Sequence, residues 1–151
     1  MKIDYLLIYL LLVALPGSYY LGYTPLLLAL MYVLFSAVTY SVYAKDKVAA
    51  QKYEWRVPEK TLQLLALCGG WPGAIVAQQH LRHKTQKFSF RLVFYIALVV
   101  NVAVFAGVHS QQGANIFHVA LNTVVDGLII LIGDSHVAHY VLFFTEVRPI
   151  I

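Results

Sequence analysis

Charged and apolar residues are strongly segregated along this chain. No Asp, Glu, Lys, Arg or His occurs in residues 5–44, a window of 40 residues. A helix that crosses an apolar layer of about 30 Å needs about 20 residues, so this window predicts two membrane crossings. The Gly-Tyr-Thr-Pro sequence at 22–25 breaks it, because Gly allows positive φ and Pro suits the first turn of a helix. We therefore expect a helical hairpin with arms at 4–22 and 25–44.

Two basic segments follow, at 45–60 and 80–91, and they hold nine of the eleven Lys and Arg residues. Short basic segments next to apolar helices favour the cytoplasmic side of a membrane. Both segments are therefore predicted to be cytoplasmic loops, and the N-terminus is predicted to lie on the same side.

The uncharged segment 61–79 lies between these basic loops. A single crossing there would place one basic loop outside, against the charge rule. Its Gly-Gly-Trp-Pro-Gly centre can end one helix and start another. We predict a re-entrant hairpin with arms of roughly 10 to 12 Å, which dips part way into the membrane and returns. A kinked crossing and an amphipathic hairpin on the membrane surface remain as alternatives.

Two further apolar segments, 92–108 and 116–133, are predicted as the third and fourth crossings, although the fourth contains Asp126. The tail, 134–151, has an apolar run too short to span, so it is expected to lie at the interface or to pack on the bundle. The predicted fold is an all-α membrane protein with three or four transmembrane helices and a Gly/Pro-broken re-entrant hairpin, forming one polytopic domain over 1–151.

Composition supports this interpretation. The chain is 60% hydrophobic and 12% charged, whereas a soluble domain carries about 25% charged residues. The net charge of +4 is too clustered to indicate nucleic-acid binding. The single cysteine, Cys68, lies in an apolar stretch and is expected to be a buried, inert thiol.

Four motifs in the middle of the chain resemble a family of small bacterial inner-membrane proteins, domain-of-unknown-function family 1294. The resemblance covers roughly residues 32–106 and implies an inner-membrane location, but no activity. The residues that carry it are Tyr43, Asp46-Lys47, Ala50, Arg56-Val57-Pro58-Glu59, Leu62, Gly69-Gly70-Trp71-Pro72-Gly73-Ala74, Arg82-His83-Lys84, Lys87 and Phe90.

A basic cluster beside the predicted hairpin is the first candidate site. It is suited to an anionic lipid headgroup, helped by the positive end of a half-helix that begins near Pro72. Attraction to anionic headgroups in general, or orientation of the protein alone, would use the same residues. The cluster consists of Arg56, Arg82, His83, Lys84 and Lys87.

Asp46 and Glu59, with His83, are candidates for acid–base chemistry on a lipid headgroup. The alternative is structural: Asp46 lies between two Lys residues, and Glu59 falls in the first turn of a predicted helix, where a carboxylate is favourable.

His118, Asn122 and Asp126 are spaced i, i+4 and i+8 and so share one helix face. Ionisable groups at membrane depth usually mark a site, here for a proton or a cation. The alternative is hydrogen bonding to a neighbouring helix, for instance at Asn101, or to a partner subunit. In the tail, Asp134, His136 and His139 have a spacing that would suit a metal ion, but three residues are a weak signal, and neither a metal nor another cofactor is predicted.

Three functional classes follow from these features. A non-enzymatic accessory or scaffold module, which binds anionic membrane lipids and a partner subunit or a second copy, fits best because the chain is too short to enclose a pathway alone. A small oligomeric transporter or channel would use the re-entrant segment and Asp126. A lipid-modifying enzyme would use Asp46, Glu59 and His83.

Overall fold

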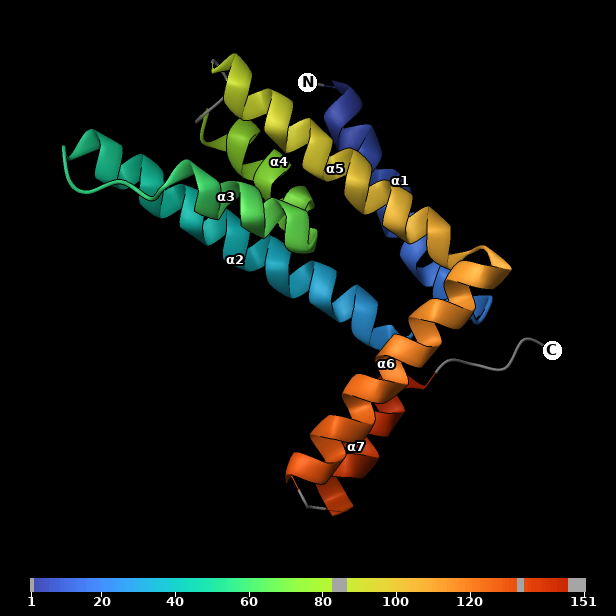
Figure 1. Ribbon diagram of the computed structural model, residues 1–151. Helices are drawn as coiled ribbons and strands as arrows, with labels where there is room; N and C mark the ends of the chain where they lie inside the picture. Colours follow the sequence, from blue (N-terminus) through green and yellow to red (C-terminus); the bar gives the residue numbers. More distant parts are fainter. Residues whose placement is uncertain (1, 83–86, 133–134, 147–151) are drawn as a thin grey trace. The chain divides into compact units, whose positions relative to one another are not determined.

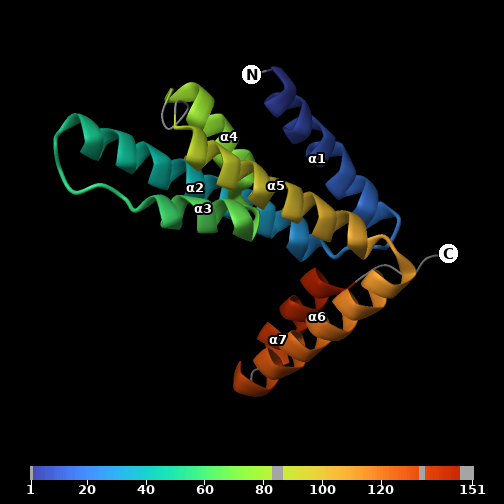
Figure 2. The same cartoon turned by 45° about the horizontal axis from the view of Figure 1, so that its top comes forward.

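The computed structural model describes residues 2–82, 87–132 and 135–146, and within these ranges every regular element is a helix. Figures 1 and 2 show the ribbon from two directions. The elements are α1 (Lys2–Tyr20), α2 (Leu26–Gln51), α3 (Glu59–Leu65), the short π-helical break η1 (Ala66–Gly70), α4 (Trp71–His80), α5 (Phe88–Val108), α6 (Gln111–Ile132) and α7 (Ser135–Thr145).

Three of these helices are long and apolar enough to cross a membrane. They contain the segments Leu26–Gln51, Phe88–Val108 and Gln112–Leu131, and the segment Asp4–Tyr20 of α1 is apolar but shorter. The predicted fold class, an all-α protein with helices of membrane-spanning length, is therefore confirmed. The re-entrant placement of 61–79 stays a prediction.

The chain divides into two compact units. Unit 1 comprises residues 1–11 and 31–103, and unit 2 comprises residues 12–30 and 104–151. The units differ in charge: unit 1 has ten Lys and Arg residues against four Asp and Glu, whereas unit 2 has one Arg against three Asp and Glu.

In unit 2, α1 ends and α2 begins around the predicted Gly-Tyr-Thr-Pro turn. Gly22 has a φ of 78°, a conformation that L residues rarely adopt. The buried hydroxyls of Ser18 and Thr24 lie 2.8 Å apart across the turn. At the start of α6, the Ser110 hydroxyl accepts a hydrogen bond from the Gly113 N–H at 3.1 Å and so caps the helix.

In unit 1, α2 continues beyond the predicted boundary at 44 and ends at Gln51. Its last turns are rich in Ala, Lys and Gln, which are good helix formers. The basic segment therefore begins within a helix. The helix ends where Tyr53 adopts a φ of 58° and the Glu54 N–H bonds to the Ala49 carbonyl at 3.0 Å.

The segment predicted as a hairpin folds as two short antiparallel helices, α3 and α4, around η1. The chain reverses at Gly69, which has a φ of 100°, and Pro72 lies in the first turn of α4. Figures 1 and 2 both show α3 lying along α2. Both outer ends of the hairpin meet the C-terminal part of α2, because Val57 bonds to Asp46 and His80 bonds to Tyr40.

Glycine allows α4 to approach the backbone of α2 closely. A Cβ atom added at Gly73 would lie 1.9 Å from the Ser36 carbonyl oxygen, and one added at Gly70 would lie 2.8 Å from that of Phe35. Real Cβ atoms do not come this close to backbone atoms, so the Gly-Gly-Trp-Pro-Gly sequence encodes packing as well as a turn.

The core of unit 1 lies where the hairpin packs against α2 and α5. Its fully buried members include Tyr43 of α2, Leu62 of α3, Trp71 of α4 and Phe90 of α5. Because each of these elements contributes a large side chain, the core fixes the hairpin and thereby positions the polar groups at its outer ends.

Candidate functional site

Basic side chains gather at one end of unit 1, where α2 and α4 end and α3 and α5 begin. Four contacts tie these elements together there: Asp46 to Val57, Tyr40 to His80, Gln78 to Tyr43, and Lys87 to Glu59. We call this region the basic end. Its described basic residues are Lys45, Lys47, Lys52, Arg56, Lys60, Arg82, Lys87 and Arg91.

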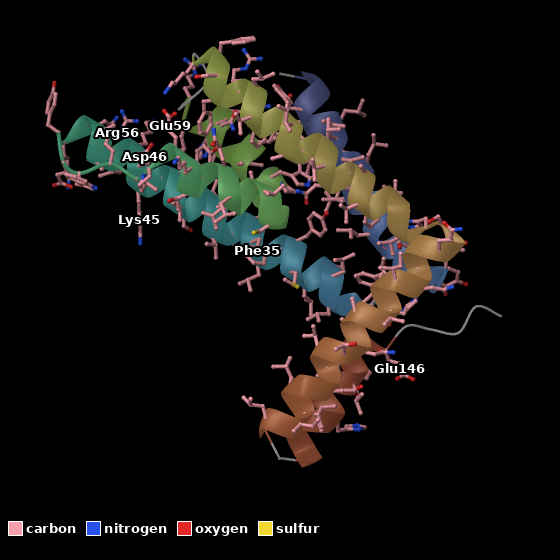
Figure 3. All side chains as sticks on the ribbon, in the orientation of Figure 1. Phe35, Lys45, Asp46, Arg56, Glu59 and Glu146 are labelled. Carbon is pink, nitrogen blue, oxygen red and sulfur yellow. The ribbon has the colours of Figure 1, made fainter. Side chains whose placement is uncertain are left out.

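Asp46 anchors the loop between α2 and α3. Its side chain is 0% exposed. One carboxylate oxygen accepts the backbone N–H of Val57 at 3.1 Å, and the two oxygens lie 3.4 Å from Nε and Nη2 of Arg56. Figure 3 shows Asp46, Arg56 and Glu59 close together, with Lys45 pointing away from them. The fork geometry pairs Asp46 with a guanidinium and leaves its carboxylate without access to solvent.

Glu59 joins the hairpin to α5. Its carboxylate accepts a hydrogen bond from Nζ of Lys87 at 2.8 Å, and both side chains are partly exposed. The two carboxylates proposed for acid–base chemistry thus form ion pairs with two members of the predicted anion-binding cluster.

The other members of that cluster are only partly described. Arg82 is exposed and has a φ of 47° in the turn after α4. His83 and Lys84 lie outside the described residues. The structure therefore brings Arg56 and Lys87 to the same end of unit 1, where each forms an ion pair with a carboxylate.

Two aromatic side chains, Tyr53 and Trp55, stand out from the α2–α3 loop. They are 98% and 94% exposed. Beside them lies a groove of about 450 Å³ whose lining includes Lys45, Val48 and Trp55. Exposed Trp and Tyr next to lysines are typical of the boundary between lipid and water.

The buried side-chain amide of Asn101 forms hydrogen bonds to the inner side of the hairpin. Nδ2 of Asn101, on α5, donates to the Leu67 carbonyl at 2.7 Å, and its Oδ1 accepts from the Tyr32 hydroxyl at 3.3 Å. Asn101 thereby satisfies a carbonyl that the break in the helix exposes. The amide that we considered as a partner for the α6 stripe thus serves the hairpin.

The prediction that Cys68 is buried is wrong. Its side chain is exposed on the protein surface at η1. The apolar residues around it in sequence alternate between the core and the surface: Ala66 is fully buried, whereas Leu67 is exposed. An apolar sequence context therefore did not determine which side of the hairpin the thiol occupies.

In unit 2, the predicted polar stripe lines a groove between α6 and α7, which lie side by side in Figures 1 and 2. The groove has a volume of about 590 Å³. Its polar lining consists of His118, Asn122 and Asp126 of α6, His139 and Thr145 of α7, and Glu146, which directly follows α7.

Of the three residues of the tail motif, His139 alone has a side chain among the described residues. Asp134 and the side chain of His136 lie outside the described residues, and His139 faces the groove. Among the described residues, no group of three or more His, Cys, Asp or Glu side chains is arranged to hold a metal ion.

Sequence reasoning missed one feature of these regions, the position of Glu146, and it left Tyr53 and Trp55 as either interfacial or packing residues. Glu146 lines the same groove as Asp126 although the two residues are far apart in the sequence. No local sequence pattern predicts that they come together. Tyr53 and Trp55 carried a usable signal, because two aromatic residues in a basic loop are typical of an interface.

The segment that matches known proteins falls within one of the two units. Residues 36–90 match the family described as protein of unknown function (DUF1294), and this range lies wholly within unit 1. The chain is 32% identical over 85 residues to the uncharacterized protein YsdA of Bacillus subtilis (strain 168). The aligned region covers 56% of this chain and 96% of that protein.

No solved structure significantly matches the chain. The relative nevertheless aligns over nearly its whole length at this identity, and the family match spans the hairpin and the basic end. The chain therefore belongs to the DUF1294 family, whose function is unknown.

Proposed function

We propose that this chain is a small integral protein of the bacterial inner membrane that serves as a non-enzymatic accessory or scaffold module and binds anionic lipid headgroups on its cytoplasmic face. The observation that carries the proposal is the basic end: almost all of the cationic side chains of unit 1 gather at one end of helices that are otherwise apolar on their surfaces. The family match supplies no activity, so the proposal rests on the charge distribution.

The apolar surfaces of the long helices support insertion in a bilayer. Exposed large hydrophobic side chains cover α2 and α5, among them Val33, Leu34, Ile96 and Val99. A contiguous apolar surface of this kind on a soluble monomer would promote aggregation. With these helices in lipid, the basic end lies at the membrane surface, and positive charge favours the cytoplasmic side.

The hairpin fits a re-entrant placement. Its outer ends meet the basic end, and its reversal lies beside Tyr32, roughly 20 Å along α2 from Asp46 at 1.5 Å per residue. Irregular backbone at such depth must be covered by protein. The buried Asn101 amide and the close packing of α4 on α2 meet that requirement.

The ion pairs at the basic end favour a binding role over catalysis. A general acid or base must reach the substrate proton, whereas the Asp46 carboxylate is fully buried and accepts the N–H of Val57. Glu59 is paired with Lys87 in a contact that joins α3 to α5. Both carboxylates thus hold segments of the protein in place.

The exposed lysines are the groups available to lipid phosphates. Lys45, Lys52 and Lys60 are exposed at the basic end, and the exposed Trp55 lines the same groove as Lys45. Each basic residue near an anionic surface contributes about 1 kcal/mol of attraction, or roughly fivefold in affinity.

The test is lipid binding by the purified chain in detergent micelles, measured by native mass spectrometry with phosphatidylglycerol and with phosphatidylcholine. We expect wild type to prefer phosphatidylglycerol. The combined variant Lys45→Gln, Lys52→Gln, Lys60→Gln should lose most of this preference, whereas the matched variant with Arg at the same three positions should keep it. Equal retention of both lipids by wild type would contradict the proposal.

A second candidate function is transport by an oligomer through the re-entrant segment and Asp126. The observation that favours it is the polar groove of unit 2, which collects two carboxylates and two imidazoles on helices of an apolar protein.

A further inference from the structure

The groove between α6 and α7 carries an inference about ligand chemistry that is separate from lipid binding at the basic end. We propose that this groove binds an amphiphilic organic cation, such as a quaternary ammonium or phosphonium ion, between the carboxylates of Asp126 and Glu146. The proposal concerns unit 2 alone, so it stands or falls independently of the proposed lipid-binding role of unit 1.

Unit 2 carries more acidic than cationic side chains. Residues 12–30 and 104–146 contain no Lys or Arg, and Arg148, the single Lys or Arg of the unit, lies outside the described residues. Asp126 of α6 and Glu146, which directly follows α7, nevertheless line the same groove. Carboxylates on apolar helices are costly unless a cation or a proton neutralises them. The groove is therefore suited to positive charge.

The size of the groove selects among cations. A volume of about 590 Å³ is far larger than a bare metal ion needs. No grouping of three metal-binding side chains occurs in the described part of the chain, which covers His118, Asp126, His139 and Glu146. A molecule with a distributed charge and a bulky body fits this space better than an ion that requires close coordination.

The apolar part of the lining selects the body of the ligand. Val125, Leu142 and Phe143 line the groove beside the carboxylates. An aromatic face attracts a cation through the ring quadrupole, and aliphatic side chains favour hydrocarbon groups. Figure 3 shows Glu146 at the end of α7. The groove thus combines negative charge with an apolar surface.

Two imidazoles, His118 and His139, also face the groove. When neutral, they carry no charge and so do not repel a cation. When protonated, they would repel it. The titratable groups that face the ligand are therefore Asp126 and His118 from α6, His139 from α7, and Glu146 directly after α7.

The experiment is equilibrium dialysis of the full chain in zwitterionic detergent micelles with radiolabelled tetraphenylphosphonium. We expect saturable binding by wild type. Asp126→Asn and Glu146→Gln should each weaken it about tenfold or more, because each removes one charge from the contact. Asp126→Glu should retain binding. Glu54→Gln, which removes the same charge from unit 1, is the matched control and should bind as wild type.

Competition with triphenylphosphine oxide, which is neutral and similar in shape, separates charge from hydrophobicity. We expect the neutral compound to displace tetraphenylphosphonium poorly. Absence of saturable binding by wild type would overturn the proposal, as would displacement by the neutral compound as effective as by unlabelled tetraphenylphosphonium. Unchanged binding in both Asp126→Asn and Glu146→Gln, with circular dichroism confirming helical folding, would overturn it as well.

Discussion

The carboxylate of Asp46 is fully buried and accepts the backbone N–H of Val57 at 3.1 Å, while Arg56 lies 3.4 Å away. Arg56 is about half exposed, so solvent screens the charge interaction and the backbone contact carries much of the stabilisation. The loop between α2 and α3 therefore depends on the Asp46 carboxylate. In the described contacts, no other side chain accepts the N–H of Val57.

Replacing this acceptor should destabilise unit 1. We expect Asp46→Ala to lower the free energy of unfolding by about 2 to 3 kcal/mol, because the N–H of Val57 loses its partner and the space of a fully buried side chain is left empty. Asp46→Asn, which keeps an acceptor oxygen, should cost less. Glu54→Gln, an exposed acid in the same loop, should change it by less than about 0.5 kcal/mol. Thermal melting in detergent measures these differences, and an Asp46→Ala melt equal to that of Glu54→Gln would be inconsistent with the anchoring role.

For single residues, the sequence indicated which side chains take part in polar contacts better than it indicated their partners. The sequence indicated a salt bridge for Asp46 because Lys45 and Lys47 flank it. The structure shows that Arg56, across the loop, forms an ion pair with it. The stripe His118, Asn122 and Asp126 follows from helical periodicity alone. Tertiary contacts are not encoded at fixed spacing, and so its counterpart Glu146 was not predictable.

Among the elements, the α3–α4 hairpin depends on glycine for its packing. Gly73 lies against the Ser36 carbonyl and Gly70 against that of Phe35, so an added methyl group has no space unless the backbones separate. Backbone atoms cannot rotate away as side chains can, and overpacking of this kind typically costs about 1 to 3 kcal/mol or more.

We therefore expect Gly73→Ala to lower the melting temperature markedly and Gly70→Ala to act in the same direction. Gly127→Ala in α6 is the matched control: a Cβ atom there meets nothing within 4 Å, and Ala has the higher helix propensity. It should leave the melting temperature unchanged or raise it slightly. A Gly73→Ala protein as stable as the Gly127→Ala protein would show that the hairpin does not need this close approach.

The predicted and observed elements differ for a physical reason. The hairpin was predictable because Gly-Gly and Pro act locally on the backbone, and the structure has its break at Gly69. The end of α2 was predicted too early, at residue 44, because the first charged residue, Lys45, was taken to end the membrane helix. Lys and Asp are compatible with a helix that extends into water, and α2 continues to Gln51.

For the whole molecule, the proposed topology places both outer ends of the hairpin on one side of the membrane. Lys52 and Arg82 are exposed at the two ends and therefore report on this directly. In a Cys68→Ala background, Lys52→Cys and Arg82→Cys should both react with a membrane-impermeant maleimide in inside-out vesicles, and neither should react in right-side-out vesicles. Labelling of the two positions from opposite sides would identify the segment as a kinked crossing.

The native thiol distinguishes a re-entrant hairpin from one that lies on the membrane surface. Cys68 is exposed on the protein at η1, the point of the hairpin farthest from the basic end. If this point lies within the bilayer, lipid covers the thiol and keeps a water-soluble reagent away from it. We expect Cys68 to resist the impermeant maleimide in vesicles of both orientations and to react once detergent dissolves the membrane. Rapid labelling in intact inside-out vesicles would place the hairpin on the cytoplasmic surface, because only there would water reach this thiol.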